Sequence, residues 1–257
     1  MNQELASLTD WFRANKLSLN ITKSNYMLFT TKRNANYAHT LKIGDTTLVK
    51  ERSIKFLGIH LDEHLTWQEH IKVCKSKIAS SIYALNKIKS LVPARSLQTL
   101  YYSLVYPYLS YGIAIWGSTF NIYRNKLVVM QKRSIRIIAN VGYCEHTSPL
   151  FKELGILKIE DIYHKEVAKL VYKYIHNELP ATLKHIFTLN SEIHNRQTRN
   201  CNDLHVKKCR TSFATRFISC KGPHIWNSLP ISIKEAHFKS IQCFTSTLKT
   251  YMINTYN

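Results

Sequence analysis

The residues of this chain that are best suited to chemistry are two pairs of adjacent acids, Asp62-Glu63 and Glu160-Asp161. Paired carboxylates can hold divalent cations, which stabilise the attacking and leaving oxygens when a phosphate group is transferred. Each pair also has a structural explanation, which we favour. The first begins a predicted loop, and the second opens a predicted helix, where acids interact favourably with the helix dipole. Because no Asp-Asp dipeptide occurs in the sequence either, we assign no catalytic residue and no metal ligand.

Cysteine and histidine form a second set of possible ligands. Cys201 and His205 are four residues apart, as are Cys220 and His224, and Cys209 lies between the two pairs. Such spacing on a helix can bring both side chains of a pair to one metal ion. The tight Cys-x2-Cys spacing that makes a zinc prediction strong is missing, so we predict no structural zinc.

Basic residues dominate the charge of the chain. Lysine and arginine number 36 against 16 acids, which gives a formal net charge of +20. This imbalance favours a polyanion such as nucleic acid as the partner, although a merely basic or ribosome-associated protein is the alternative. Lys72 and Lys75 on one predicted helix, with Lys132, Arg133 and Arg136 on another, could contact phosphates, and a solvated helix face is the alternative. The charge favours phosphate contacts for this set as a whole.

Targeting signals are not apparent. The stretch from Met1 to Asn20 has no apolar run typical of a signal peptide. No segment approaches the ~20 apolar residues of a membrane span, and the region from Leu97 to Trp116 is interrupted by serine, proline and glycine. We expect an intracellular protein, cytoplasmic or nuclear, with reduced cysteines and no membrane partner.

The elements that would position these residues follow from the apolar spacing. Helical spacing predicts an amphipathic helix at the start, carried by Leu5, Leu8, Trp11 and Phe12. Apolar runs from Tyr26 to Phe29 and from Ile54 to Leu61 each predict one strand. Gly44-Asp45 between Leu41–Ile43 and Thr47–Val49 predicts a hairpin.

A helical pattern replaces this mixed region after Thr66. Thr66 and Glu69 fit a capping box, in which each side chain satisfies a free N–H group of the helix start. Three apolar stripes then predict three consecutive helices within residues 71–88, 97–105 and 127–138. Further helices are predicted at 148–154, 159–174 and 238–252, whereas the apolar period fades between Ala181 and Lys221. The pattern indicates an α+β fold, with a small sheet followed by a helical bundle.

Several segments together resemble the reverse transcriptases, or RNA-directed DNA polymerases, of jockey-like non-LTR (LINE-type) retrotransposons. The segment with the most weight is Phe56-Leu57-Gly58-Ile59-His60-Leu61-Asp62, which resembles the strand that follows the active site in that family. The other landmarks occur in the family's order and contain all four tryptophans: Trp11 to Asn20, Lys23 to Phe29, Leu65-Thr66-Trp67 with His70-Ile71, Leu100 to Leu104, Tyr106 to Gly112, Trp116-Gly117, Ser148 to Leu154, His194-Asn195 with Thr198-Arg199, and Gly222 to Pro230. No landmark is specific alone, but this order along almost the whole chain is hard to obtain by chance.

The resemblance implies an architecture. Residues 1–61 resemble the rear of the polymerase palm, with a small antiparallel sheet and a helix. Residues 62–142 resemble the thumb, a helical bundle that contacts the primer-template. Residues 143–257 resemble the family's mostly helical or irregular, basic C-terminal region.

The resemblance also implies roles for individual residues. Lys23 falls in the motif after the active site, where a lysine can approach the triphosphate of the incoming nucleotide; an exposed surface lysine is the alternative. Phe56, Leu57 and Gly58 resemble the primer-grip strand, and Gly58 would allow a close approach of backbone or nucleic acid; a buried strand with a tolerated glycine is the alternative. The partners would be RNA and DNA, as a primer-template or in a ribonucleoprotein with the element's RNA.

The family's polymerases carry an Ala-Asp-Asp turn that binds Mg²⁺ upstream of the Phe-Leu-Gly strand, and this sequence has no Asp-Asp pair. We therefore expect a truncated polymerase that holds no cofactor of its own and binds nucleic acid without catalysis. Two alternatives stay open: an incomplete gene model of an active polymerase, and a non-enzymatic module that binds nucleic acid.

Overall fold

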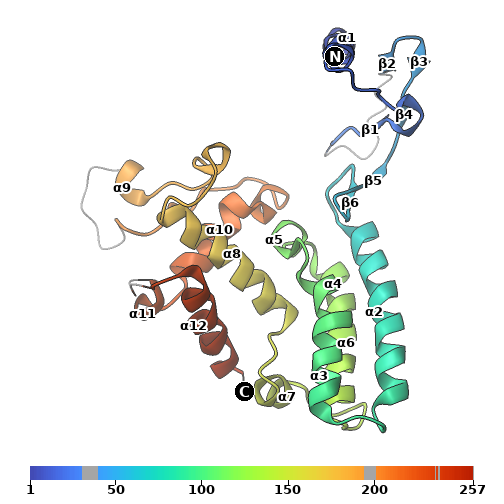
Figure 1. Ribbon diagram of the computed structural model, residues 1–257. Helices are drawn as coiled ribbons and strands as arrows, with labels where there is room; N and C mark the ends of the chain where they lie inside the picture. The colour runs from blue at the N-terminus through green and yellow to red at the C-terminus, as the bar shows by residue number, and fades with distance from the viewer. Residues whose placement is uncertain (31–39, 194–200, 235, 237, 257) are drawn as a thin grey trace. The chain divides into compact units, whose positions relative to one another are not determined.

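The computed structural model describes residues 1–30, 40–193, 201–234, 236 and 238–256 of the chain. These residues combine helices with small sheets, as the sequence predicted. The chain divides into two compact units, Met1–His70 (unit 1) and Ile71–Asn257 (unit 2), and each is described by itself (Figure 1). The assignment of residues 1–61, 62–142 and 143–257 to palm, thumb and C-terminal region stays a prediction.

Unit 1 opens with the predicted amphipathic helix α1 (Asn2–Ala14), followed by a 3-10 turn η1 (Ile21–Lys23). The predicted hairpin is confirmed as β2 (Lys42–Ile43) paired antiparallel with β3 (Thr46–Thr47). The predicted strand at 26–29 is wrong in extent, because β1 covers only Asn25–Tyr26 and pairs in parallel with β4 (Val49–Lys50). Such short parallel pairing leaves the apolar residues that follow Tyr26 without a ladder.

The single strand predicted from Ile54 to Leu61 is wrong, because the Phe-Leu-Gly segment forms the turn of a hairpin. Two antiparallel strands, β5 (Ser53–Phe56) and β6 (Ile59–Asp62), are joined by Leu57 and Gly58, and Phe56 pairs with Ile59. Leu57 has φ 45° and Gly58 has φ 83°, the left-handed backbone of a two-residue hairpin turn. The glycine therefore allows the chain to reverse, so Phe56-Leu57-Gly58 is a hairpin tip and not a strand interior, and it is exposed rather than buried.

The start of α2 (Gln68–Ile88) is organised by Asp62 in addition to the predicted capping residues. The Asp62 carboxylate accepts hydrogen bonds from the backbone N–H groups of His64, Thr66 and Trp67 at 3.2, 2.9 and 2.7 Å. The Thr66 hydroxyl accepts from the backbone of Gln68 at 3.3 Å, one residue earlier than a capping box requires. The carboxylate thus fixes the loop that leads from β6 into the helix.

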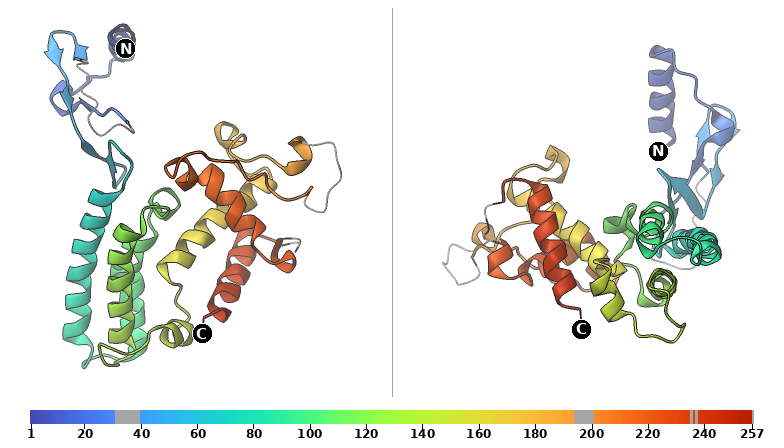
Figure 2. Two further views of the ribbon diagram at one scale, coloured as in Figure 1. Left: turned by 180° about the vertical axis from the view of Figure 1, so that it is seen from behind. Right: turned by 60° about the horizontal axis from the view of Figure 1, so that its bottom comes forward.

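The first part of unit 2 is a set of neighbouring helices, α2, α3 (Ala94–Leu104) and α6 (Asn121–Ile138) (Figures 1 and 2). The predicted stripes are confirmed, since Ile71, Ile78 and Leu85 of α2 and Leu127 of α6 are buried. The Ser81 hydroxyl of α2 donates to the backbone oxygen of Leu104 at 2.9 Å. Two short helices that the sequence did not predict, α4 (Tyr106–Ser110) and α5 (Ile113–Trp116), connect α3 to α6.

The second part of unit 2 is built on α8 (Ile159–Ile175), which follows the short helix α7 (Ser148–Glu153). Helices α10 (Ile218–Asn227) and α12 (Ile241–Asn254) both pack against α8. The aromatic rings of Tyr172 and Phe244 stack at 4.5 Å between α8 and α12. The remaining elements are short: η2 (Ala181–Leu183), α9 (Asn190–Ile193), η3 (Ala214–Arg216) and α11 (Ile231–Lys234).

Helix α10 was not predicted, because Gly222 and Pro223 interrupt its apolar pattern. A Cβ atom at Gly222 would overlap the ring of Phe187, so the glycine allows α10 to approach this ring closely. Among the described residues, no helix is long and apolar enough to cross a membrane.

One buried side chain joins the two parts of unit 2. Gln131 of α6 donates to the Tyr101 hydroxyl and to the backbone oxygen of Leu157, each at 2.9 Å. Its side-chain oxygen accepts from the backbone of Ile159 at 2.9 Å, at the first residue of α8. Because all of its hydrogen-bonding groups have partners at the centre of the core, Gln131 sets the start of α8 relative to α3 and α6.

Candidate nucleic-acid interface

The segment at the start of unit 2 contains positively charged side chains and no negatively charged ones. Between Ile71 and Cys144 the sequence contains eleven lysines and arginines and no aspartate or glutamate. Helices of soluble proteins ordinarily mix both signs on their exposed faces. This acid-free segment, residues 71–144, therefore presents a field of one sign to any anion that approaches it.

The predicted phosphate-binding cations lie mainly on its exposed faces. Lys72 and Lys75 of α2 and Lys132 and Arg133 of α6 are exposed. Among the described residues, Lys75, Lys132 and Arg133 take part in no ion pair. Their charges therefore remain available to an external anion.

Arg136 differs from the other predicted cations. It is half-buried, its Nε donates to the backbone oxygen of Glu145 at 2.8 Å, and its guanidinium lies 5.8 Å from the centre of the Tyr143 ring. The side chain thus holds the loop after α6. A phosphate contact by Arg136 would use only its remaining N–H groups.

The other predicted site residues belong to unit 1. Phe56 and Leu57, at 61% and 74% exposed, form the apolar tip of the β5–β6 hairpin. Lys23 is exposed at the end of η1, where its backbone N–H donates to the side-chain oxygen of Asn20 at 3.2 Å. The hairpin tip and Lys23 are accessible to a ligand, and their assigned roles stay predictions.

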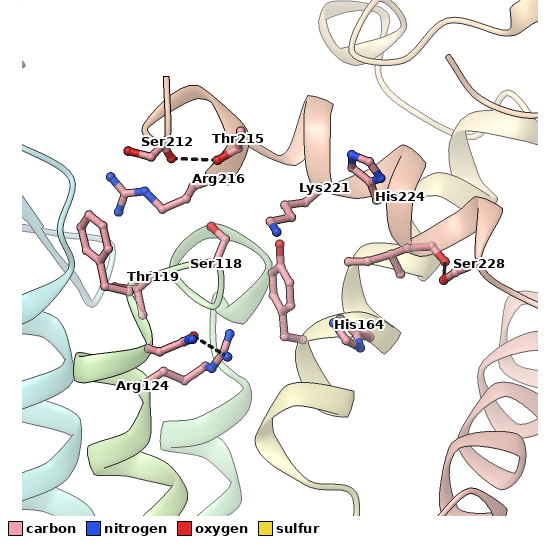
Figure 3. Close-up of a pocket in the computed structure, with 14 residues that line it drawn as sticks. Ser118, Thr119, Arg124, His164, Ser212, Thr215, Arg216, Lys221, His224 and Ser228 are labelled. Carbon is pink, nitrogen blue, oxygen red and sulfur yellow. Dashed lines mark hydrogen bonds between the residues drawn. The ribbon is translucent and has the colours of Figure 1, made fainter. Parts of the chain in front are cut away.

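A polar pocket of about 590 Å³ lies within unit 2, where α6, α8, η3 and α10 meet (Figure 3). Arg124 reaches it from α6, Arg216 from η3, Lys221 and His224 from α10, and His164 from α8. The hydroxyl groups of Ser118, Thr119, Ser212, Thr215 and Ser228 also line it. None of the described residues that line it is acidic, so the pocket is suited to an anion.

The charges and burial at the pocket change the pKa values of two of its lining residues. Burial lowers the pKa of His164, and the charges of Arg124 and Lys221 lower it further against the opposing effect of Asp161 and Glu160. Burial also raises the pKa of Tyr163 to about 12, so its hydroxyl stays protonated and remains a hydrogen-bond donor. The pocket thus holds fixed cations and neutral donors near neutral pH.

The adjacent acids do not fit a two-metal site. Asp62 is occupied by backbone N–H groups, as described above. Glu160 and Asp161 point to different partners: Glu160 lies 3.3 Å from Arg124, whereas Asp161 accepts a hydrogen bond of 2.5 Å from Tyr256. Burial raises the pKa of Asp161, which further disfavours a charged metal ligand there.

The cysteines and histidines do not assemble a metal site either, within the part of the chain that is described. The sulfur atoms of Cys209 and Cys220 lie 2.6 Å apart, and both residues line a second pocket next to the first. The absence of structural zinc stays a prediction.

Comparison with known proteins shows which proteins the chain resembles in sequence. The chain is 27% identical over 165 residues to a probable RNA-directed DNA polymerase from transposon BS of Drosophila melanogaster. It is 23% identical over 164 residues to a probable RNA-directed DNA polymerase from transposon X-element of the same species. It is 26% identical over 172 residues to the RNA-directed DNA polymerase from mobile element jockey of Drosophila funebris.

The chain is a homologue of the RNA-directed DNA polymerases of non-LTR elements. The similarity covers 63% of the chain for the BS and X-element polymerases and 66% for the jockey polymerase, but only 18% of each of these relatives. The matched part of the chain therefore spans less than a fifth of the length of these relatives. No family model and no solved structure matches it. The resemblance read from the landmarks is confirmed at the level of the family.

Sequence reasoning missed the pocket, because its cations come from segments that are far apart in the chain. Arg124, Arg216 and Lys221 share no spacing that would mark a common site, and η3 and α10 lie in a region without apolar periodicity. The acid-free segment was a visible signal in the sequence, and counting acids along the chain would have found it.

Proposed function

We propose that the helices of the acid-free segment bind the sugar-phosphate backbone of a primer-template duplex, as part of a non-LTR RNA-directed DNA polymerase. The observation that carries this proposal is the single sign of charge over residues 71–144, most of it on exposed helix faces. The relatives are RNA-directed DNA polymerases by name, and a polymerase of that kind must hold a duplex of RNA and DNA.

Phosphate contacts from lysine and arginine position a duplex without reading its sequence. Lys72, Lys75, Lys132 and Arg133 offer such contacts from two neighbouring helices, which is the arrangement expected of a thumb. Within unit 1, the exposed apolar tip of the β5–β6 hairpin is a separate candidate for contact with nucleic acid. Affinity without sequence preference suits a polymerase, which must accept every sequence that it copies.

Titration of the chain with labelled RNA–DNA duplexes of unrelated sequence tests this function. If about six phosphates are neutralised, log K should fall with log salt with a slope of about −4 to −5. The affinities of the different duplexes should agree within a few-fold. A salt-independent affinity, or no binding at low salt, contradicts the proposal.

We also propose that this chain does not polymerise DNA by itself. Mg²⁺ loses its water reluctantly and needs carboxylates already in place, and the adjacent acids of this chain serve other partners. Primer extension on an RNA template with Mg²⁺ or Mn²⁺ should give no product. Extension that is lost on Asp62→Asn or Asp161→Asn would show that the active site has been misplaced.

A further inference from the structure

The pocket between α6, α8, η3 and α10 is distinct from the exposed helix cations, and its geometry points to a bound ligand of its own. We propose that it binds the phosphate group of a nucleotide, with Arg124, Arg216 and Lys221 as the cations that hold it. The inference does not depend on duplex binding by the helices of the acid-free segment.

Arg124 is the inner cation of the pocket. Its side chain is 19% exposed, and one terminal nitrogen donates to the side-chain oxygens of Asn121 at 2.8 Å and of Glu160 at 3.3 Å. Its Nε atom is buried and has no hydrogen-bond partner among the described residues. A buried N–H group without a partner is costly, and a phosphate oxygen in the pocket would satisfy it. Among the described residues, Glu160 is the acid that forms an ion pair with Arg124, and it does not line the pocket.

Arg216 is the outer cation, and aromatic rings hold it in place. Its guanidinium carbon lies 4.0 Å from the centre of the Phe120 ring and 5.3 Å from that of Phe213. Stacking on aromatic rings fixes the plane of the guanidinium group, and a planar guanidinium matches the geometry of a phosphate. Phe120 also remains 41% exposed, which leaves ring surface for a base.

The size and donors of the pocket fit a nucleotide better than a simple ion. Its volume of about 590 Å³ is within the range of small-molecule sites, about 300–1,000 Å³, and much larger than a phosphate group needs. The second pocket, of about 520 Å³, shares Thr215, Lys221 and His224 with it and adds Lys207 and Lys208. Among the described residues no acid lines the second pocket either, so the two pockets form adjoining basic depressions that suit an anion with more than one phosphate group.

A phosphate group can reach the pocket as a free anion or as part of a nucleic-acid strand. The test therefore uses two probes, inorganic phosphate and a 5′-phosphorylated trinucleotide, titrated by calorimetry into the full chain at constant ionic strength. The pocket variant is Arg216→Gln with Lys221→Gln. The matched control is Lys132→Gln with Arg133→Gln, which removes the same charge from the exposed face of α6.

We expect the trinucleotide to bind the pocket variant at least about tenfold more weakly than the unchanged chain, and the control to differ by less than about twofold. Binding of inorganic phosphate with the same dependence would identify the phosphate alone as sufficient, whereas binding of the trinucleotide only would identify the strand. Equal weakening by both variants, or no binding of either probe to the unchanged chain, overturns the proposal. Thermal unfolding of each variant shows whether the fold is retained, and Arg216→Lys, which keeps the charge, should recover part of the affinity if the fold is intact.

The two proposals can fail separately. Duplex affinity should fall in the control variant and stay within about twofold in the pocket variant, because the exposed helix cations remain. Loss of trinucleotide binding with unchanged duplex binding would assign the pocket a ligand site of its own.

Discussion

Leu57 and Gly58 are the residues at which the hairpin tip can be tested without disturbing its strands. Both have positive φ, which asparagine tolerates far better than leucine, and Asn-Gly is the preferred pair for this turn. We predict that Leu57→Asn stabilises the β5–β6 hairpin by up to about 0.5 kcal/mol, whereas Gly58→Val destabilises it by about 1–2 kcal/mol. Amide hydrogen exchange in β5 and β6 measures both changes.

The same pair of variants separates turn geometry from binding. If Leu57 contacts nucleic acid, Leu57→Asn should weaken duplex binding although it stabilises the hairpin. Unchanged duplex affinity would show that the exposed leucine serves no ligand. Faster exchange in Leu57→Asn would contradict the assignment of the turn.

His70 is the residue whose protonation the fold resists most. Its side chain is 4% exposed, its Nδ1 faces the backbone N–H of His60 at 3.5 Å, and burial followed by the nearby His60 lowers its pKa to about 4. His70 is therefore protonated below about pH 6.5 in the unfolded chain, but only below about pH 4 in the folded chain. The contribution of neutral His70 to stability is present above pH 6.5 and is lost as the pH falls towards 4.

We predict that stability falls by up to about 3 kcal/mol between pH 7 and pH 4 through His70 alone. Urea unfolding at several pH values should show a shallower decrease for His70→Gln than for the unchanged chain. The direct observation is the imidazole signal of His70 in an NMR titration. A midpoint near 6.5 would contradict the buried, neutral state.

At the scale of elements, the junction of α3, α6 and α8 depends on Gln131. We predict that Gln131→Leu lowers the free energy of unfolding by about 2–4 kcal/mol, because it keeps the volume but leaves buried partners of the amide unsatisfied. Urea unfolding gives this value, and Gln242→Leu on the exposed face of α12 is the control, expected to change stability by less than about 0.5 kcal/mol. Similar small effects of both variants would show that the hydrogen bonds of Gln131 do not stabilise the packing of α3, α6 and α8.

The helices with clear apolar stripes were predictable, because burial of one face is a local property of the sequence. Ile71, Ile78 and Leu85 mark α2 by their spacing, and the structure buries all three. Two features were not predictable from spacing. The turn at Leu57-Gly58 lies inside one apolar run. Helix α10 contains a glycine and a proline, and the close packing against Phe187 explains the glycine.

Of the two candidate sites, one was predictable from the sequence and the other was not. The exposed cations of α2 and α6 follow from helical periodicity and charge, so the sequence alone indicates them. The pocket depends on how α6, η3 and α10 come together, and no local pattern encodes that meeting. A site built from Arg124, Arg216 and Lys221 becomes visible only when the tertiary structure is known.

At the scale of the whole molecule, the two units differ in how much apolar surface they bury. In the described part of unit 1, α1 has no buried residue, and Leu8 and Trp11 are 47% and 53% exposed. Unit 2 buries a continuous core that includes Trp116, Tyr101, Phe151 and Phe244. Unit 2 thus contains most of the buried core of the described chain, and it carries both the acid-free segment and the polar pocket.

We expect the helices of the acid-free segment, and not basic charge in general, to bind nucleic acid. The most direct test compares two variants that each lose four positive charges. The first replaces Lys72, Lys75, Lys132 and Arg133 by glutamine; the second replaces four exposed cations elsewhere in unit 2, Lys152, Lys184, Arg210 and Lys239.

The measurement is the salt dependence of binding to one labelled RNA–DNA duplex. We predict that the slope of log K against log salt becomes less steep by about 3–4 in the first variant and by less than about 1 in the second. Equal changes of slope in both variants, or a larger change in the second, would contradict the claim.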